Sequence, residues 1–232
     1  MNAMAAAAGR RLARRPPWPW IAVTGGIAGL LLAMAVTLAS VKGFSIGFLL
    51  RDPNAIARQP FYYGMLQYAG SVALAATGGI ALFSGAVLGK LRPEGSGAAF
   101  LALGGLLSLL LAADDLFQLH ENMWRIGLGE TEVFAVYGAL AIALVVCNPL
   151  TVIQTPLSLG LISGFFFAAS VVIDSPALGI DKRLPVGTED CLELFGIGFW
   201  SAYFVKCSRD GILRAQDTAS RRSGSRPWDV TG

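Results

Sequence analysis

The feature that most constrains this chain is a series of six apolar stretches close to membrane-spanning length, separated by short polar segments. A bilayer is crossed by a helix of about 20 apolar residues. Only 14% of the residues are charged, whereas a soluble domain carries about 25%. The sequence therefore predicts an all-α integral membrane protein, built as a bundle of about six transmembrane helices. The apolar stretches cover residues 18–41, 61–89, 98–118, 132–147, 157–173 and 189–205.

Polar segments flank this predicted transmembrane domain, which occupies residues 18–206. Residues 1–17 form a basic N-terminal segment, and the composition of residues 207–232 predicts a disordered tail. Basic residues concentrate in both ends and in the turn at Lys90 and Arg92. The positive-inside rule places these three regions in the cytoplasm. We therefore expect a multi-pass protein of the inner cell membrane with both termini cytoplasmic.

The charge and cysteine patterns argue against a nucleic-acid-binding protein, a disulfide-stabilised domain and a zinc knuckle. The basic residues lie at the ends rather than in a patch, so no nucleic-acid partner is predicted. Three cysteines without CxxC spacing predict neither a disulfide framework nor a zinc knuckle. Membrane lipids are the expected partners. Glycine pairs such as Gly25/Gly29 and Gly85/Gly89 allow a close helix neighbour, which can be internal, a second copy of the chain or another membrane protein.

Acidic residues gather at one end of the predicted bundle. The third apolar stretch runs outward in the six-helix topology and ends in two adjacent aspartates and the single histidine of the chain. The outer ends of the fifth and sixth stretches bring further carboxylates to the same level. Ionisable groups at this depth are costly and usually serve a function. The residues concerned are Asp114, Asp115, His120, Glu121, Asp174, Glu189 and Glu193.

The helix dipole separates the ordinary members of this set from the unusual ones. Glu189 follows Thr188 at a predicted helix N-terminus, where a carboxylate is favourable without any function. Asp114 and Asp115 lie near a helix C-terminus, where the dipole disfavours them, and they also repel each other. We therefore expect a shared proton or a bound cation to compensate.

A divalent metal is one cation that could compensate the two aspartates, because carboxylates and an imidazole together bind Zn²⁺, Fe²⁺ or Mn²⁺. On one continuous helix, Asp115 and His120 are about 140° apart. His120 can therefore join the same ion only if the helix ends or unwinds after Gln118. The spacing matches no established metal-binding motif. The predicted ligand set is Asp115, His120, Glu121, Asp174 and Glu193, with Asp114 and Glu189 as spare carboxylates for catalysis as general bases.

Each candidate also has an ordinary explanation. Asp114 and Asp115 can form a solvated helix end at the membrane interface, and His120 can be an exposed boundary residue. Asp174 can cap the turn that begins at the following Ser-Pro pair.

Three functions are consistent with the sequence, and it does not decide whether the protein is an enzyme. The leading hypothesis is metal-dependent hydrolysis or oxidation of a lipid-like substrate near the extracytoplasmic leaflet. The second is a cation or proton transporter. It needs a polar path to the cytoplasmic side, but the inner halves of the apolar stretches contain few ionisable residues. The third is a non-catalytic accessory subunit of a larger membrane complex.

Overall fold

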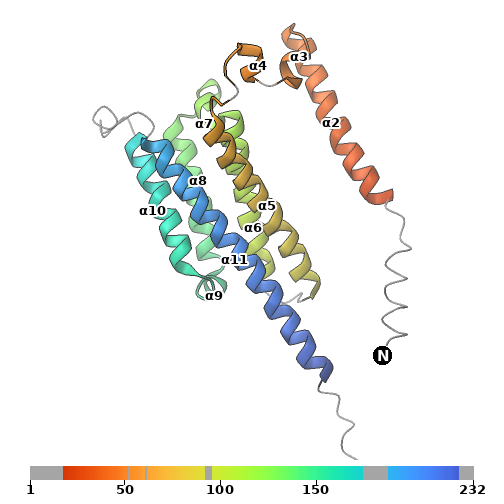
Figure 1. The fold of residues 1–232 in the computed structure, drawn as a ribbon, viewed down its shortest axis with the longest axis vertical. Coiled ribbons are helices and arrows are strands. Elements are labelled where there is room, and N and C mark those ends of the chain that lie inside the picture. The colour runs from red at the N-terminus through yellow and green to blue at the C-terminus, as the bar shows by residue number, and fades with distance from the viewer. Residues whose placement is uncertain (1–17, 52, 61, 92–95, 175–187, 225–232) are drawn as a thin grey trace, which may run out of the picture. The chain divides into compact units, whose positions relative to one another are not determined.

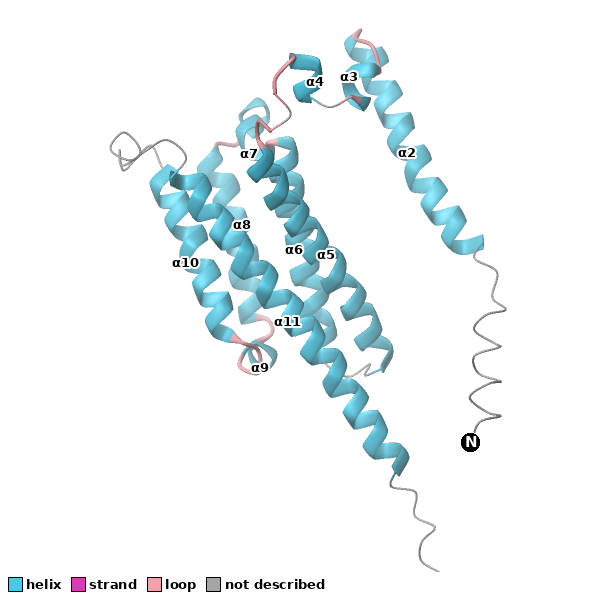
Figure 2. Cartoon of the chain, in the orientation of Figure 1, coloured by secondary structure: helices cyan, strands magenta, loops and turns pink. Residues whose placement is uncertain are grey.

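The computed structural model describes residues 18–51, 53–60, 62–91, 96–174 and 188–224. Within these ranges every regular element is a helix, which confirms the predicted all-α class (Figures 1 and 2). The chain divides into two compact units, Met1–Tyr63 and Gly64–Gly232. The acidic residues singled out by the sequence all belong to the second unit.

The described part of the first unit contains α2 (Trp18–Lys42) and two short helices, α3 (Gly47–Leu50) and α4 (Pro53–Ala57). α2 coincides with the first predicted apolar stretch. Gly43 follows it at φ +71°, a left-handed conformation that glycine adopts at low cost and that commonly ends helices. α3 and α4 form in the polar segment between the first two predicted apolar stretches. Pro53 occupies the first helical position of α4, where its missing N–H is tolerated.

The second unit is built on long helices that match the remaining predicted stretches. α6 packs against α5, α11 packs against both α10 and α5, and α8 packs against α6 (Figure 1). Short helical segments α7 (Leu119–Asn122), η1 (Met123–Ile126) and α9 (Pro149–Val152) connect them. The long helices are α5 (Met65–Leu91), α6 (Ser96–Phe117), α8 (Glu130–Val146), α10 (Leu157–Asp174) and α11 (Thr188–Gly224).

The C-terminal part of α11 corrects one prediction. The sequence predicts a disordered tail from residue 207, but α11 continues to Gly224 as a 37-residue helix. Lys206 Nζ donates to Asp210 Oδ2 at 2.9 Å in an i,i+4 pair, and this hydrogen bond is the main reason that the pKa of Asp210 lies below its usual value. Cys207 and Ala215 of this helix are buried. Packing and local charge pairing therefore extend the helix beyond the apolar stretch.

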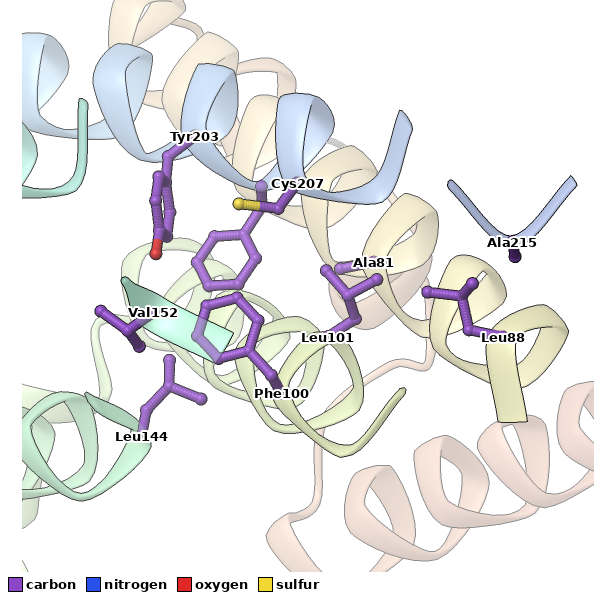
Figure 3. Close-up of a cluster of buried hydrophobic side chains, with 10 residues drawn as sticks. Ala81, Leu88, Phe100, Leu101, Leu144, Val152, Tyr203, Cys207 and Ala215 are labelled. Atoms are coloured by element: carbon purple, nitrogen blue, oxygen red, sulfur yellow. The ribbon is translucent and has the colours of Figure 1, made fainter. Parts of the chain in front are cut away.

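An apolar core joins side chains of α5, α6, α8, α9 and α11 (Figure 3). Phe204 is fully buried, and its ring stacks on that of Phe100 with centroids 5.6 Å apart. Gly104 of α6 makes room for it: a Cβ at that position would lie 2.0 Å from Phe204 Cε1. The absence of a side chain at Gly104 is thus a steric requirement of this core.

Glycine also sets the distance between α5 and α6. A Cβ on Gly78 would lie 2.9 Å from the carbonyl oxygen of Gly105, and a Cβ on Gly105 would lie 2.9 Å from that of Gly78. Gly85 of the predicted Gly85/Gly89 pair likewise lies against the backbone of α6, so the neighbour of this pair is internal. Such close backbone approach is typical of small residues between apolar helices.

Two helices, Met65–Leu91 and Gly97–Phe117, are long and apolar enough to cross a membrane. Two further apolar helices, Ala28–Lys42 and Leu157–Ile173, are shorter. Because buried helices of soluble proteins pass the same test of length and composition, two such helices are weak evidence of membrane association. The six-span bundle and the orientation of its ends are not confirmed by this finding.

We predict that Gly104→Ala destabilises the bundle by about 1–3 kcal/mol, because the new methyl group would overlap the fully buried Phe204 ring and overpack the core. Gly79→Ala is the matched control, since a Cβ at Gly79 of α5 meets nothing within 4 Å. That change should be neutral or stabilise the helix by up to about 1 kcal/mol. Unfolding midpoints followed by circular dichroism in mild detergent check both values. Equal midpoints for the two variants would contradict the packing described for Gly104.

Candidate functional site

The candidate site forms where α6 ends. α6 stops at Phe117, Gln118 adopts a left-handed conformation (φ 49°, ψ 49°), and α7 begins at Leu119. This conformation costs a non-glycine residue about 1–2 kcal/mol. The helix therefore breaks at the residue where the sequence analysis required a break for His120 to reach the carboxylates.

The break places His120 against Asp114, six residues earlier. The backbone N–H of His120 donates to Asp114 Oδ1 at 2.8 Å, and its ring Nδ1 lies 2.8 Å from Asp114 Oδ2. The Tyr137 hydroxyl of α8 also hydrogen-bonds to Asp114, and the ring of Phe134 lies 5.3 Å from that of His120. Asp114 is only 6% exposed. A buried carboxylate thus joins α6, α7 and α8.

This geometry fixes the chemistry of the imidazole. An ionised carboxylate only accepts hydrogen bonds, so a contact between Asp114 and Nδ1 places the proton of the neutral ring on Nδ1. Nε2 then carries the lone pair and is the atom that can accept a proton or bind a metal. Asp114 holds the ring in that tautomer and stabilises the imidazolium that forms when Nε2 is protonated.

Asp115 faces a different helix. Gln67 Nε2 of α5 donates to Asp115 Oδ1 at 3.2 Å, and the fully buried Ser71 hydroxyl, one turn later, donates to Asp115 Oδ2. The two adjacent aspartates therefore diverge, one toward α7 and α8 and the other toward α5. Their separation lowers the mutual repulsion that the sequence analysis expected.

α11 brings Glu193 to the same region. The half-buried Glu193 carboxylate interacts electrostatically with Asp115, Asp190, His120 and Asp114. The packing around Gly70 of α5 shows how close the helices are. A Cβ at Gly70 would lie 3.0 Å from Ile197 Cδ1 of α11 and 3.9 Å from Asp115 Oδ2 of α6. Three predicted residues, Asp115, His120 and Glu193, therefore converge with Asp114.

Within the described residues, no hydrogen bond or ion pair joins the Glu189 side chain to this group. Glu189 lies in the first turn of α11, and its backbone carbonyl accepts a hydrogen bond of 3.0 Å from the Ser170 hydroxyl of α10. Glu121 belongs to α7 and Asp174 to α10, but their side chains lie outside the described residues. The catalytic assignment of Glu189 stays a prediction.

Among the described side chains, no group of three or more His, Cys, Asp or Glu residues is arranged to hold a metal ion. The structure thus gives no support to metal binding. The five-residue ligand set stays a prediction, because two of its members, Glu121 and Asp174, have side chains outside the described part.

The neutral hydrogen-bond donors of the site were not predicted from the sequence. Gln67, Ser71 and Tyr137 supply hydrogen bonds that offset the unfavourable position of two carboxylates at a helix C-terminus. A signal was present for two of them, since Gln67 and Ser71 are polar residues four apart at the start of an apolar helix. A tyrosine inside an apolar stretch, such as Tyr137, gives no comparable signal.

Residues 22–207 match the model of a protein family described as a domain of unknown function, DUF8692. The match spans most of the chain, so the chain belongs to this family. The searches of curated proteins and of solved structures gave no match.

We predict that Gln118→Gly raises the stability of the protein by about 1 kcal/mol, because glycine removes the cost of the left-handed conformation without altering the break. Gln118→Ala is the matched control: it removes the same side chain but keeps the Cβ responsible for that cost. Unfolding midpoints in the same detergent compare the two. A Gln118→Gly variant no more stable than Gln118→Ala would contradict a strained break at this residue.

Proposed function

We propose that this DUF8692 chain is a six-helix inner-membrane protein whose acid–histidine site acts on a lipid-like substrate near the extracytoplasmic leaflet. Large apolar side chains that face outward support the membrane assignment. Exposed examples occur on each long helix of the second unit, whereas soluble proteins rarely expose apolar patches of this extent. They include Val72, Phe83, Leu106, Ile142, Val146, Phe165 and Phe195.

The distribution of charge along the helices supports the orientation. Gln67 and Lys90 mark opposite ends of α5. On α11, Glu193 and Lys206 lie about 20 Å apart along the helix axis, somewhat less than the roughly 30 Å hydrocarbon core. The basic residues are therefore remote from the acidic site on both helices. With the positive-inside rule, this polarity favours cytoplasmic termini and a site that opens toward the other leaflet.

The contact between Asp114 and His120 is the observation that carries the proposed chemistry. An imidazole held by a buried carboxylate through Nδ1 is suited to general acid–base catalysis at Nε2. In hydrolysis of an acyl ester, Nε2 takes a proton from the attacking water and returns it to the leaving alcohol. Asp114 stabilises the intervening imidazolium. Asp115 and Glu193 supply further carboxylates beside the reacting groups.

A divalent metal belongs to the same proposal. If Zn²⁺, Fe²⁺ or Mn²⁺ binds, Nε2 of His120 and the carboxylates of Asp115 and Glu193 would hold it after their side chains move together, since the described side chains are not arranged to hold a metal ion. Asp114 would then orient the imidazole as a carboxylate behind a metal-bound histidine. The chemistry supplied at this site by such an ion would be activation of water or oxygen. The predicted residues Glu121 and Asp174 complete or replace members of this set.

The activity test uses detergent-purified full chain with a fluorogenic acyl ester and a fluorescent short-chain phospholipid as probes. Asp114→Asn and Glu193→Gln should each lower the rate by about 10²-fold or more, the usual contribution of a positioned acid or base. Asp210→Asn is the control, because this residue lies on α11 in a surface pair with Lys206. Full activity in both folded site variants would remove the enzymatic hypothesis.

Elemental analysis tests the metal. Protein purified without chelators is compared with an Asp115→Asn/Glu193→Gln double variant. If the wild-type chain contains stoichiometric metal and the variant contains none, these residues are metal ligands. If the wild-type protein contains no metal and still hydrolyses a probe, the reaction belongs to the Asp114–His120 pair alone.

Buried hydroxyl groups favour a proton transporter as the second candidate. Ser71, Thr77 and Ser84 are buried along α5, and the hydroxyls of Ser201 and Ser208 on α11 have no hydrogen-bond partner among the described atoms. These groups continue from the acidic site toward the basic ends of both helices. Proton uptake by proteoliposomes under an imposed potential, lost in Glu193→Gln, would favour transport over hydrolysis.

The accessory-subunit hypothesis predicts stoichiometric co-purification of a membrane partner.

A further inference from the structure

The first unit contains a cavity of about 300 Å³ formed by the segment that follows α2. Its lining includes Ser45, Phe48, Arg51, Ile56 and Arg58. This volume is at the lower end of the range for pockets that hold small ligands, about 300–1,000 Å³. All lining residues belong to α3, α4 or the turns beside them, so the cavity is independent of the acidic site.

Local structure explains why two arginines line one cavity. Arg51 directly follows α3, and Arg58 directly follows α4. The turn before α3 is held by the Gly47 N–H, which donates to Ser45 Oγ at 3.3 Å. The end of α4 is held by the Gln59 N–H, which donates to the carbonyl oxygen of Asn54 at 2.8 Å. The ends of consecutive short helices thus bring the two arginines to the lining of one cavity.

Arg58 occupies this position in an unfavourable backbone conformation. Its φ of +54° lies in the left-handed region, where arginine has no intrinsic preference and glycine is favoured. Strained conformations at non-glycine residues concentrate at functional sites. An arginine in this position therefore points to a role for its side chain, because glycine would satisfy the backbone better.

The chemistry of the lining is that of an anion site with an apolar margin. The described lining residues include no carboxylate, and Asp52 is the single acidic residue in the sequence of this unit. Guanidinium groups bind phosphate oxygens through paired hydrogen bonds. Phe48 lines the cavity, and the neighbouring Leu49 and Leu50 are exposed apolar residues that can contact acyl chains.

We infer that Arg51 and Arg58 form a binding site for the phosphate of an anionic phospholipid headgroup, with Phe48 and its neighbours against the acyl chains. Free phosphate shares the charged part of this chemistry but not the apolar part. The site goes beyond the function proposed for the acidic residues, because it would bind a lipid whether or not the Asp114–His120 pair catalyses a reaction.

Native mass spectrometry of the full chain in neutral detergent tests the inference, with short-chain phosphatidylglycerol as the probe and phosphatidylcholine as the zwitterionic comparison. Arg51→Gln and Arg58→Gly should each weaken phosphatidylglycerol binding by about tenfold, the order of magnitude of one charge-assisted hydrogen bond. Lys42→Gln, which removes a basic residue of the same unit outside the cavity lining, should leave binding within about twofold, as expected of a solvated surface charge.

Arg58→Gly separates binding from folding, because glycine favours the backbone conformation of this position. A variant that melts no lower than wild type and has lost phosphatidylglycerol binding supports the site. Unchanged binding in both Arg51→Gln and Arg58→Gly, or an equal loss in Lys42→Gln, overturns it. Competition by inorganic phosphate distinguishes the two sources of phosphate. Weak competition supports the lipid, whereas phosphate that binds as tightly as phosphatidylglycerol overturns the lipid assignment.

Discussion

The hydrogen bonds from His120 to Asp114 hold the candidate site together. One carboxylate accepts the backbone N–H and contacts Nδ1 of the same residue, both at 2.8 Å, while a hydroxyl from α8 reaches it as well. These contacts pair a buried charge that would otherwise be costly. They also fix the first turn of α7 against the end of α6, so the same interaction that stabilises the helix break orients the imidazole for chemistry.

The bundle supports this site through close packing at two levels. At the site, Gly70 lets α5 approach Asp115 and the side chains of α11. Further along the helices, Gly78 and Gly105 allow α5 and α6 to touch through their backbones, and Gly104 accommodates the Phe204 ring. The small residues therefore set the helix distances that allow carboxylates from α6 and α11 to interact. Polar chemistry at one end of the bundle depends on apolar packing over its length.

Hydrophobic patterning predicted the helices well, because long apolar stretches bounded by glycine, proline and charge leave few alternatives. It missed the extension of α11 to Gly224, since the apolar pattern ends near residue 205. Beyond it the helix is supported by the local i,i+4 pair of Lys206 with Asp210 and by burial of Ala215, which is a tertiary feature. The need for a break after Gln118 was predicted from the angle between Asp115 and His120. The hydrogen bonding of His120 to Asp114 was not predicted. A helical wheel cannot show where the chain goes after a left-handed residue.

The chain contains a single histidine, so nitrogen-15 NMR of histidine-labelled protein in detergent reports on His120 alone. We predict that, at a pH high enough for the ring to be neutral, the imidazole of the wild-type protein carries its proton on Nδ1. We further predict that Asp114→Asn shifts the neutral ring toward the Nε2–H tautomer that free histidine prefers, while Asp210→Asn leaves the wild-type spectrum unchanged. An imidazole with the same tautomer mixture in wild type and Asp114→Asn would contradict the central claim that Asp114 orients His120.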